Sequence, residues 1–201
     1  LQSGQVLAYP TEAVWGLGCD PYNQQAFEQI LSLKNRPIEK GVILIAASLE
    51  QVEPFLHGLS DVQIAQMQQS WQISEQQRAT TWLIPLTEAV PTWISGQHDR
   101  VAIRVTTHPL VRQLCDGFGG AIVSTSANPA GLPPAKSSAD IQHYFGEQLA
   151  VLEGVLIVVA ALLIIREAVP ALQNPTLPEA PFLGLAINGL AAIINAAWAT
   201  L

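Results

Sequence analysis

The sequence predicts an α/β or α+β domain in which helices flank a twisted mixed sheet. Two observations indicate this class. Short apolar runs rich in branched residues alternate with segments of helical periodicity, and a chain of 201 residues is long enough to bury a core. The alternation runs through residues 1–147, and no internal repeat is visible. We therefore expect residues 1–147 to form one domain.

The elements can be placed from apolar runs and capping residues. Runs at Gln5–Tyr9 and Val42–Ala46 predict buried strands. Between them, Asn23 is a suitable N-cap for a helix that ends near Leu33. The same signals predict the later elements in this order: a helix from Ser48 to about Leu56, a helix from Ser60 to about Gln69, strands at Thr80–Ile84 and Val101–Val105, a helix at His108–Phe118, a strand at Ala121–Thr125 and a helix at Ser138–Tyr144.

The charge and cysteine content narrow the function classes. A formal net charge of -7 argues against broad non-specific binding of nucleic acid, which relies on many Lys and Arg contacts to phosphate. Cys19 and Cys115 form no CxxC pair, and the four His residues show no metal-ligand spacing. No secretory signal opens the residues given. A reducing, cytoplasmic location is therefore expected.

The composition changes near residue 148. Beyond that point only Glu153, Arg166, Glu167 and Glu179 carry charge. Two apolar runs, Leu149–Ile165 and Phe182–Leu201, are joined by a proline-rich piece and would each be about 26–30 Å long as a helix, at the lower edge of a membrane span. Residues 148–201 are therefore expected to form an apolar helical hairpin, either transmembrane or buried against the first domain.

A cluster of cations stands out in this acidic chain. Lys34, Arg36 and Lys40 are three of its nine basic residues and fall within seven positions. Pro37 is expected to end the preceding helix, because it lacks an N–H and restricts the residue before it. The three side chains could then converge on a phosphate-like anion. The alternative is a solvated helix end, with cations at the negative end of the macrodipole.

The segment Ser124–Gly131 follows a predicted strand and is rich in polar groups. Three hydroxyls and an amide fall within five positions, and Pro129 and Gly131 keep the backbone irregular. Such a turn can line a nucleotide or a carboxylate, but an ordinary turn contains the same residues. Gly16 and Gly18 lack the rest of a dinucleotide fingerprint, and the chain has no G-K-[ST], so neither a Rossmann site nor a P-loop is indicated.

Four segments, taken in order and spacing, resemble the YrdC/TsaC family of L-threonylcarbamoyladenylate synthases. They are Tyr9–Asp20, Leu33–Gly41, Ala102–Pro109 and Ser124–Gly131, and the resemblance covers residues 1–147. It implies a twisted sheet with a concave, positively lined cavity. It also implies a reaction that joins L-threonine, bicarbonate and ATP into threonylcarbamoyl-AMP and pyrophosphate, which supplies the t6A37 modification of tRNA. Partners would then include tRNA or other proteins of the t6A pathway.

The resemblance also assigns roles by position. Thr11 would contact threonine, and Arg104 and Thr81 would help to hold substrate. Mg²⁺ is expected with ATP, because fixed and bound cations stabilise the charge that develops in adenylate transfer. Glu12 and His108 lie in the matching segments and are interpreted as structural. The remaining residues would neutralise bicarbonate and the ATP phosphates or line the nucleotide site: Lys34, Arg36, Lys40, Ser124, Ser126 and Asn128.

The chain departs from the family pattern in two places. A Trp-Pro-Gly-Pro-type turn is replaced by Trp71–Thr80, and the usual soluble terminal segment is absent. Instead, Val151–Pro170 and Leu185–Asn195 resemble transmembrane spans of cation diffusion facilitator transporters, without their Asp and His metal ligands. A join of two unrelated sequences is one interpretation. Two functions therefore remain as alternatives: a non-catalytic RNA- or nucleotide-binding module, and a fragment of a membrane transporter.

Overall fold

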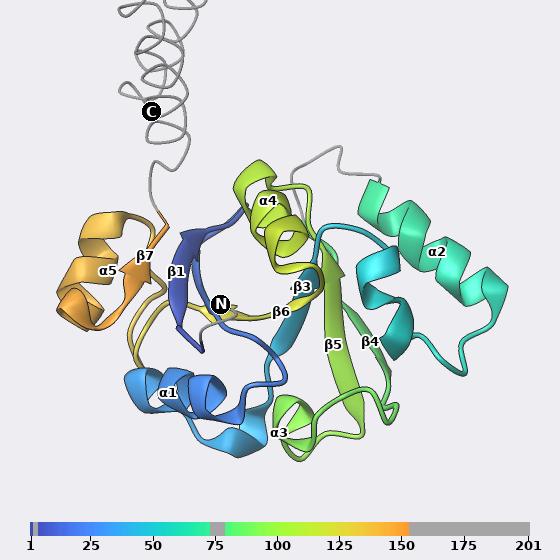
Figure 1. Ribbon diagram of the computed structural model, residues 1–201, viewed down its shortest axis with the longest axis horizontal. Helices are drawn as coiled ribbons and strands as arrows, with labels where there is room; N and C mark the ends of the chain where they lie inside the picture. The colour runs from blue at the N-terminus through green and yellow to red at the C-terminus, as the bar shows by residue number, and fades with distance from the viewer. Residues whose placement is uncertain (2–3, 73–78, 153–201) are drawn as a thin grey trace, which may run out of the picture. The chain divides into compact units, whose positions relative to one another are not determined.

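A computed structural model describes residues 1, 4–72 and 79–152 of the chain. Residues Leu1–Glu153 form one compact unit. Its centre is a seven-stranded sheet with the strand order β4-β5-β3-β6-β2-β1-β7 (Figure 1). The strands are β1 (Leu7–Pro10), β2 (Trp15–Gly18), β3 (Ile43–Ala46), β4 (Trp82–Pro85), β5 (Arg100–Val105), β6 (Ile122–Ser126) and β7 (Ala150–Val151).

The sheet is mixed, as the sequence predicts. Strand β3 pairs in parallel with β5, and β1 pairs in parallel with β7, while the other four pairings are antiparallel. The helices are α1 (Gln24–Lys34), α2 (Asp61–Gln72), α3 (Thr92–Ser95), α4 (Pro109–Phe118) and α5 (Ser138–Phe145), with 3₁₀ turns η1 (Ile38–Lys40), η2 (Glu50–Phe55) and η3 (Gly146–Gln148).

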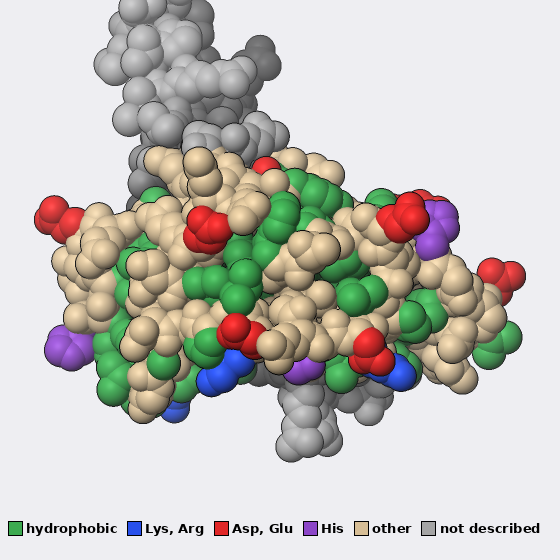
Figure 2. Space-filling view, turned by 90° about the horizontal axis from the view of Figure 1, so that it is seen from below, with side chains coloured by type: hydrophobic (Ala, Val, Ile, Leu, Met, Phe, Trp, Pro, Cys, Tyr) green, Lys and Arg blue, Asp and Glu red, His purple; other side chains and the backbone are tan. Residues whose placement is uncertain are grey.

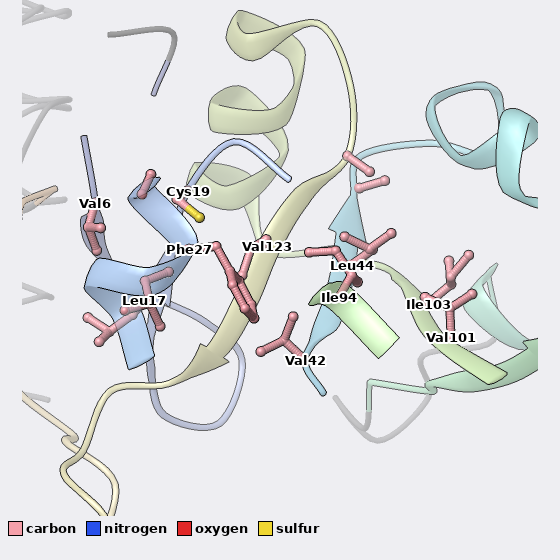
Figure 3. Close-up of a cluster of buried hydrophobic side chains, with 14 of the residues drawn as sticks. Val6, Leu17, Cys19, Phe27, Val42, Leu44, Ile94, Val101, Ile103 and Val123 are labelled. Atoms are coloured by element: carbon pink, nitrogen blue, oxygen red, sulfur yellow. The ribbon is translucent and has the colours of Figure 1, made fainter. Parts of the chain in front are cut away.

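Side chains alternate between the two faces of the sheet, and each face has its own apolar cluster. On one face, Phe27 of α1 and Ile94 of α3 pack against strand residues such as Val123 (Figure 3). On the other face, Val111 and Cys115 of α4 pack against Tyr9, Ile45 and Ile122. Figure 1 shows α4 on the side of the sheet opposite α1 and α3.

The segment after Tyr9, for which the sequence predicted no element, contains a strand. β2 pairs with β1 in the register Tyr9↔Gly16 and Leu7↔Gly18. The two glycines are needed because the Tyr9 ring lies across them: a Cβ on Gly18 would come within 2.8 Å of the ring and 2.5 Å of the Val123 oxygen. Gly16 and Gly18 therefore make room for a buried aromatic side chain.

The predicted elements are largely confirmed, with shifts at their ends. Asn23 caps α1, accepting a hydrogen bond from the Ala26 N–H at 3.0 Å. The helix ends at Lys34, close to the predicted end near Leu33, but Asn35 in the left-handed conformation (φ 48°) ends it, and not Pro37 as predicted. The segment predicted as a helix from Ser48 is the 3₁₀ turn η2, which contains Pro54.

The predicted hairpin of residues 148–201 falls almost entirely outside the described residues, because nothing after Leu152 is described. The few described residues there belong to the domain: Leu149 is buried in the core, and Ala150 and Val151 pair with β1. The predicted boundary between residues 147 and 148 stays a prediction. Within the described residues, no helix is long and apolar enough to cross a membrane. The replaced loop Trp71–Thr80 is also largely outside the description, since residues 73–78 are not described.

Candidate active site

Helix α4 covers only one end of its face of the sheet, and a cavity of about 610 Å³ opens at the other end. Its floor is a row of cross-strand neighbours, because Ala102 pairs with both Leu83 and Ile43, and Ile43 pairs with Ser124. The cavity is lined by Arg36, Lys40, Gly41, Val42, Ile43, Leu83, Ile94, Ser95, His98, Asp99, Arg100, Ala102, Ser124, Thr125 and Ser126. The floor is thus apolar toward β4 and carries hydroxyls toward β6.

The cavity wall next to Arg36 and Lys40 is formed where two backbone segments touch. Gly41, which follows η1, and Gly96, which follows α3, have φ angles of 56° and 62°. A Cβ on Gly41 would lie 2.8 Å from the Ser95 oxygen, and one on Gly96 would collide with the backbone of Glu39. Only glycine permits both the left-handed conformation and this close approach. The contact holds the segment that carries Arg36 and Lys40 against α3.

Arg36 lines the cavity and is held by its own turn. Its Nη2 donates to the Gly41 oxygen at 2.9 Å and to the Lys40 oxygen at 3.3 Å. Its Nε is buried and has no hydrogen-bond partner among the described residues. Burial lowers the pKa of this guanidinium from its ordinary value. Arg36 therefore lines the cavity with a guanidinium that still has one buried donor unpaired among the described residues.

Lys34 has a different environment from its neighbours in the cluster. Its side chain is only 3% exposed, and Nζ donates to the main-chain oxygens of Ser126 and Asn128, the latter at 2.8 Å. Burial, with the nearby Arg36 charge, lowers the pKa of Lys34 to about 8. The structure therefore does not bring all three cations to one cavity, and their binding of an anion stays a prediction. Arg36 and Lys40 line the cavity, whereas Lys34 lies beneath the Ser126–Asn128 segment.

The polar segment after β6 divides into two parts. Ser124 and Ser126 line the cavity, and their contact with a nucleotide stays a prediction. The amide of Asn128 instead donates from Nδ2 to the Leu132 oxygen at 2.7 Å and closes its own turn. Its Oδ1 is buried without a partner among the described residues. Asn128 therefore has one unsatisfied acceptor next to the loop that Lys34 anchors.

Arg104 and Thr81 lie on the same face as the cavity floor but are engaged with each other. Arg104 Nε donates to Thr81 Oγ1 at 2.8 Å. Residues Arg100, Ala102 and Arg104 alternate along β5 with the buried Val101 and Ile103, so the three share the open face. Neither Arg104 nor Thr81 lines the 610 Å³ cavity. Both lie near its floor.

Thr11 lies at the turn between β1 and β2, outside the residues that line the cavity. Its Oγ1 donates to the Val14 oxygen at 2.6 Å, and its methyl group lies near Gly16, which pairs with Ser126. Next to it, Glu12 accepts hydrogen bonds from the Thr106 hydroxyl and from the backbone N–H groups of Thr107 and His108, both at 3.2 Å. These bonds agree with the structural interpretation of Glu12.

The sequence reasoning missed four polar residues of the cavity: Ser95, His98, Asp99 and Arg100. The first three lie in or just after α3, and Arg100 begins β5. Their approach to Arg36 depends on the Gly41–Gly96 contact, which has no local sequence signal. No group of three or more His, Cys, Asp or Glu side chains that could hold a metal ion occurs in the described part of the chain.

Comparisons with known proteins identify relatives over the same region. The Sua5/YciO/YrdC family model, described as "telomere recombination", matches residues 1–160. The threonylcarbamoyl-AMP synthase of Acinetobacter baylyi is 59% identical over 77% of this chain and 81% of its own length. Those of Cellvibrio japonicus and Pseudomonas aeruginosa are 50% and 47% identical, over 74% and 78% of this chain and 76% and 82% of their own lengths.

Solved structures share the fold. P. abyssi Sua5 in complex with L-threonine is 27% identical, with a TM-score of 0.66 over 75% of this chain and 43% of that one. This chain thus spans less than half of that longer protein. E. coli YciO, 20% identical, has a TM-score of 0.62 over 75% of this chain and 71% of its own and shows the fold alone. The chain belongs to the Sua5/YciO/YrdC family, and its relatives of 47–59% identity are threonylcarbamoyl-AMP synthases.

Proposed function

We propose that the protein forms threonylcarbamoyl-AMP and pyrophosphate from L-threonine, bicarbonate and ATP, the step that supplies the t6A37 modification of tRNA. The observation that carries the proposal is the cavity itself. It places Arg36, Lys40, Ser124 and Ser126 around one apolar floor, in a chain that is 59% identical to a threonylcarbamoyl-AMP synthase. A cavity of about 610 Å³ is of the size that small-molecule substrates occupy.

The chemistry requires positioning and charge stabilisation rather than a covalent nucleophile. The threonine nitrogen forms a bond to the bicarbonate carbon, and hydroxide leaves with the amine proton as water. A carbamate oxygen then bonds to the α-phosphorus of ATP while the bond to the pyrophosphate oxygen breaks. Because both steps bring anions together, cations fixed at the site lower the barrier.

Arg36 is the residue best placed for this role. It is fixed by two backbone acceptors, and its buried Nε still lacks an acceptor among the described residues. A planar guanidinium held in this way suits a carboxylate or phosphate oxygen. Lys40 is exposed at the cavity and adds a second positive charge, and the hydroxyls of Ser124 and Ser126 can donate to the nucleotide.

Lys34 and Asn128 shape the site from below in this proposal. The Lys34 ammonium fixes the main chain of Ser126 and Asn128, so it sets the position of the Ser126 hydroxyl in the cavity. Asn128 would act on the nucleotide through the position of this segment, because its buried Oδ1 does not line the cavity. Thr11 would contact threonine from the β1–β2 turn, and the Arg104–Thr81 pair would support substrate at the other end of the floor.

Mg²⁺ would arrive with ATP rather than occupy a site built by the protein. Asp99 is the only acidic residue among the described residues that line the cavity, and it is 93% exposed. Mg²⁺ keeps several waters and is commonly bound through substrate phosphates and one or two carboxylates. The described residues fit that arrangement and do not fit a preformed metal site.

The proposal is tested by threonine- and bicarbonate-dependent exchange of pyrophosphate into ATP, together with detection of threonylcarbamoyl-AMP. The full chain should catalyse both, and Arg36→Ala should reduce the rate at least a hundredfold, within the range of lost transition-state stabilisers. Arg112→Ala removes an exposed charge on α4 and should change neither. Exchange that survives Arg36→Ala, or that ignores threonine, would refute the proposal.

The alternative of an RNA-binding module without turnover gains little support from the surface. On the face shown in Figure 2, few Lys and Arg side chains are visible, and Asp and Glu side chains lie beside them. Binding of tRNA through that face would lack the phosphate contacts that dominate affinity. Interaction with tRNA or with other proteins of the t6A pathway, membrane association and a cytoplasmic location stay predictions.

A further inference from the structure

Most of the cationic side chains near the cavity already donate hydrogen bonds to other protein groups. The Lys34 ammonium donates to two main-chain oxygens, the Arg36 guanidinium to two, and Arg104 to Thr81. The triphosphate of ATP carries about four negative charges, which an adenylating site must neutralise. The side chains of two cations in the cavity lining, Lys40 and Arg100, make no hydrogen bond to any residue that the structure describes.

Arg100 is the cation that the sequence reasoning did not assign. It begins β5, lines the cavity and keeps 55% of its side chain exposed. Its one ionic partner among the described residues is Asp99, with Nε and Oδ1 3.9 Å apart and the carboxylate 93% exposed. A pair so exposed is worth little in water, so a multivalent anion can compete for the guanidinium.

The strand order decides which part of ATP Arg100 can reach. In the proposed reaction the α-phosphate must lie near threonine, which Thr11 would hold at the β1 side. Arg100 is on β5, four strands away from β1 and two from Ser126 on β6. At about 4.8 Å between neighbouring strands, these separations are roughly 19 Å and 10 Å. Arg100 is therefore too far from the α-phosphate, whereas the β- and γ-phosphates can extend toward it across the floor.

The adenine base is a poorer partner for the Arg100 guanidinium than the phosphates are. The adenine base is uncharged and suits the apolar floor formed by Leu83, Ala102 and Ile43. A guanidinium gains more from the leaving pyrophosphate, whose negative charge increases as the bond to the α-phosphorus breaks. We propose that Arg100 binds the β- and γ-phosphates of ATP and the departing pyrophosphate, as a substrate-binding residue of the proposed reaction.

The same geometry predicts that Asp99 weakens the contact between Arg100 and the phosphates. Its carboxylate lies beside the Arg100 guanidinium and adds a negative charge at the mouth of the cavity. Removing that charge frees Arg100 and lessens repulsion of a polyphosphate. The two neighbouring residues should therefore have opposite effects on ATP affinity.

The test measures equilibrium binding of ATP, AMP and pyrophosphate to the full chain by calorimetry. Arg100→Gln should weaken ATP and pyrophosphate about tenfold, or about 1.4 kcal/mol, while AMP affinity stays within twofold. Asp99→Asn should tighten ATP about threefold. Arg112→Gln removes an exposed arginine of α4 and should leave all three affinities unchanged.

Two results would overturn the inference: unchanged ATP affinity in Arg100→Gln, or an equal loss for AMP, which would move the contact to the base or the α-phosphate. The inference rests on the proposed function, but the two fail separately. A wild-type chain that binds ATP with this pattern and makes no threonylcarbamoyl-AMP refutes the function alone. Product formation with unchanged affinities in Arg100→Gln refutes the inference alone.

Discussion

The ammonium group of Lys34 donates a hydrogen bond to the main-chain oxygen of Asn128 at 2.8 Å, joining the end of α1 to a turn 94 residues later. It donates in the same way to Ser126, and the Ala130 N–H returns a bond of 2.7 Å to the Lys34 oxygen. The cation is therefore part of the framework of the site. Lys34 would therefore affect substrate in two ways, through the segment that it anchors and through its positive charge.

Lys34→Met should lower the stability of the protein as well as its affinity for ATP. Methionine fills a similar volume but has no donor, so two main-chain oxygens lose a buried partner, at about 1–3 kcal/mol for each unsatisfied group. We expect urea unfolding to show a loss of about 2–4 kcal/mol. Lys136→Met, at an exposed lysine, should change stability by less than about 0.5 kcal/mol. Equal stability of the two variants would show that Lys34 does not anchor the turn.

The pKa of Lys34 predicts opposite effects of alkaline pH on binding and on stability. Burial and Arg36 lower the folded-state pKa from 10.5 to about 8, so the charge is lost as pH rises through about 8. ATP affinity should therefore fall between about pH 7 and 9 in the wild type. Calorimetric titrations across this range should give a flatter profile for Lys34→Met.

Stability should change in the other direction over a higher range. Between about pH 8 and 10.5 the unfolded chain keeps the Lys34 proton while the folded chain has released it, so this residue makes the free energy of unfolding rise with pH. Urea unfolding of the wild type and of Lys34→Met should isolate the effect, since other titrating groups are shared. A difference that stays constant from pH 7.5 to 10.5 would contradict the lowered pKa.

Features with a local cause could be predicted from the sequence. Asn23 caps α1 because its side chain reaches an N–H three residues later, and Ser60 is positioned in the same way before α2. The strand at residues 15–18 was not predicted. It contains two glycines, which are typical of a loop. Only the Tyr9 ring that lies over them explains why a strand needs glycine here. That contact is a property of the pairing between β1 and β2.

The candidate site divides in the same way. Arg36, Lys40, Ser124 and Ser126 stand in short motifs and were found, and all four line the cavity. The burial of Lys34 could not be predicted, because its partners are more than 90 residues away in the sequence. Arg100 carries no motif of its own. Only the register of β5 in the sheet places it on the open face.

Glu12→Gln should lower stability at neutral pH through the junction between β5 and α4. The carboxylate accepts bonds from Thr106, Thr107 and His108, and these bonds hold its pKa below its ordinary value of 4.5 although burial opposes them. A neutral amide accepts more weakly at this helix start, so we expect a loss of about 1–2 kcal/mol at pH 7. Chemical unfolding measures it, with Glu147→Gln as the exposed control.

The stabilities of the wild type and of Glu12→Gln at acid pH test whether the ionised carboxylate is the stabilising form. A carboxylate whose folded-state pKa is lowered contributes stability above its unfolded value, and that contribution is lost as pH falls from about 4.5 through the folded pKa. The gap between wild type and Glu12→Gln should therefore be full at pH 6 and shrink toward pH 3. A gap that is the same at both pH values would mean that the ionised form is not what stabilises the junction.

Gly18→Ala should disturb the sheet beneath the cavity. Its Cβ would lie 2.5 Å from the Val123 oxygen and 2.8 Å from the Tyr9 ring, whose hydroxyl donates to that same oxygen at 3.3 Å. Because the strand and a fully buried ring must both move, we expect a loss of about 2–3 kcal/mol in urea unfolding. Since Ser124 follows Val123 on β6, ATP affinity should fall as well.

Gly117→Ala is the matched control, because that glycine lies in α4 with open space around its Cβ position. Alanine is favoured over glycine in a helix by about 0.5–1 kcal/mol, so this variant should gain stability and keep its ATP affinity. The two substitutions add the same methyl group and differ only in what surrounds it. If both variants unfolded at the same urea concentration, close packing of Tyr9 on the β1–β2 hairpin would not be what requires glycine at position 18. If only stability changed and ATP affinity did not, Tyr9 and β6 would tolerate the shift without moving Ser124, and the floor of the cavity would be decoupled from the hairpin.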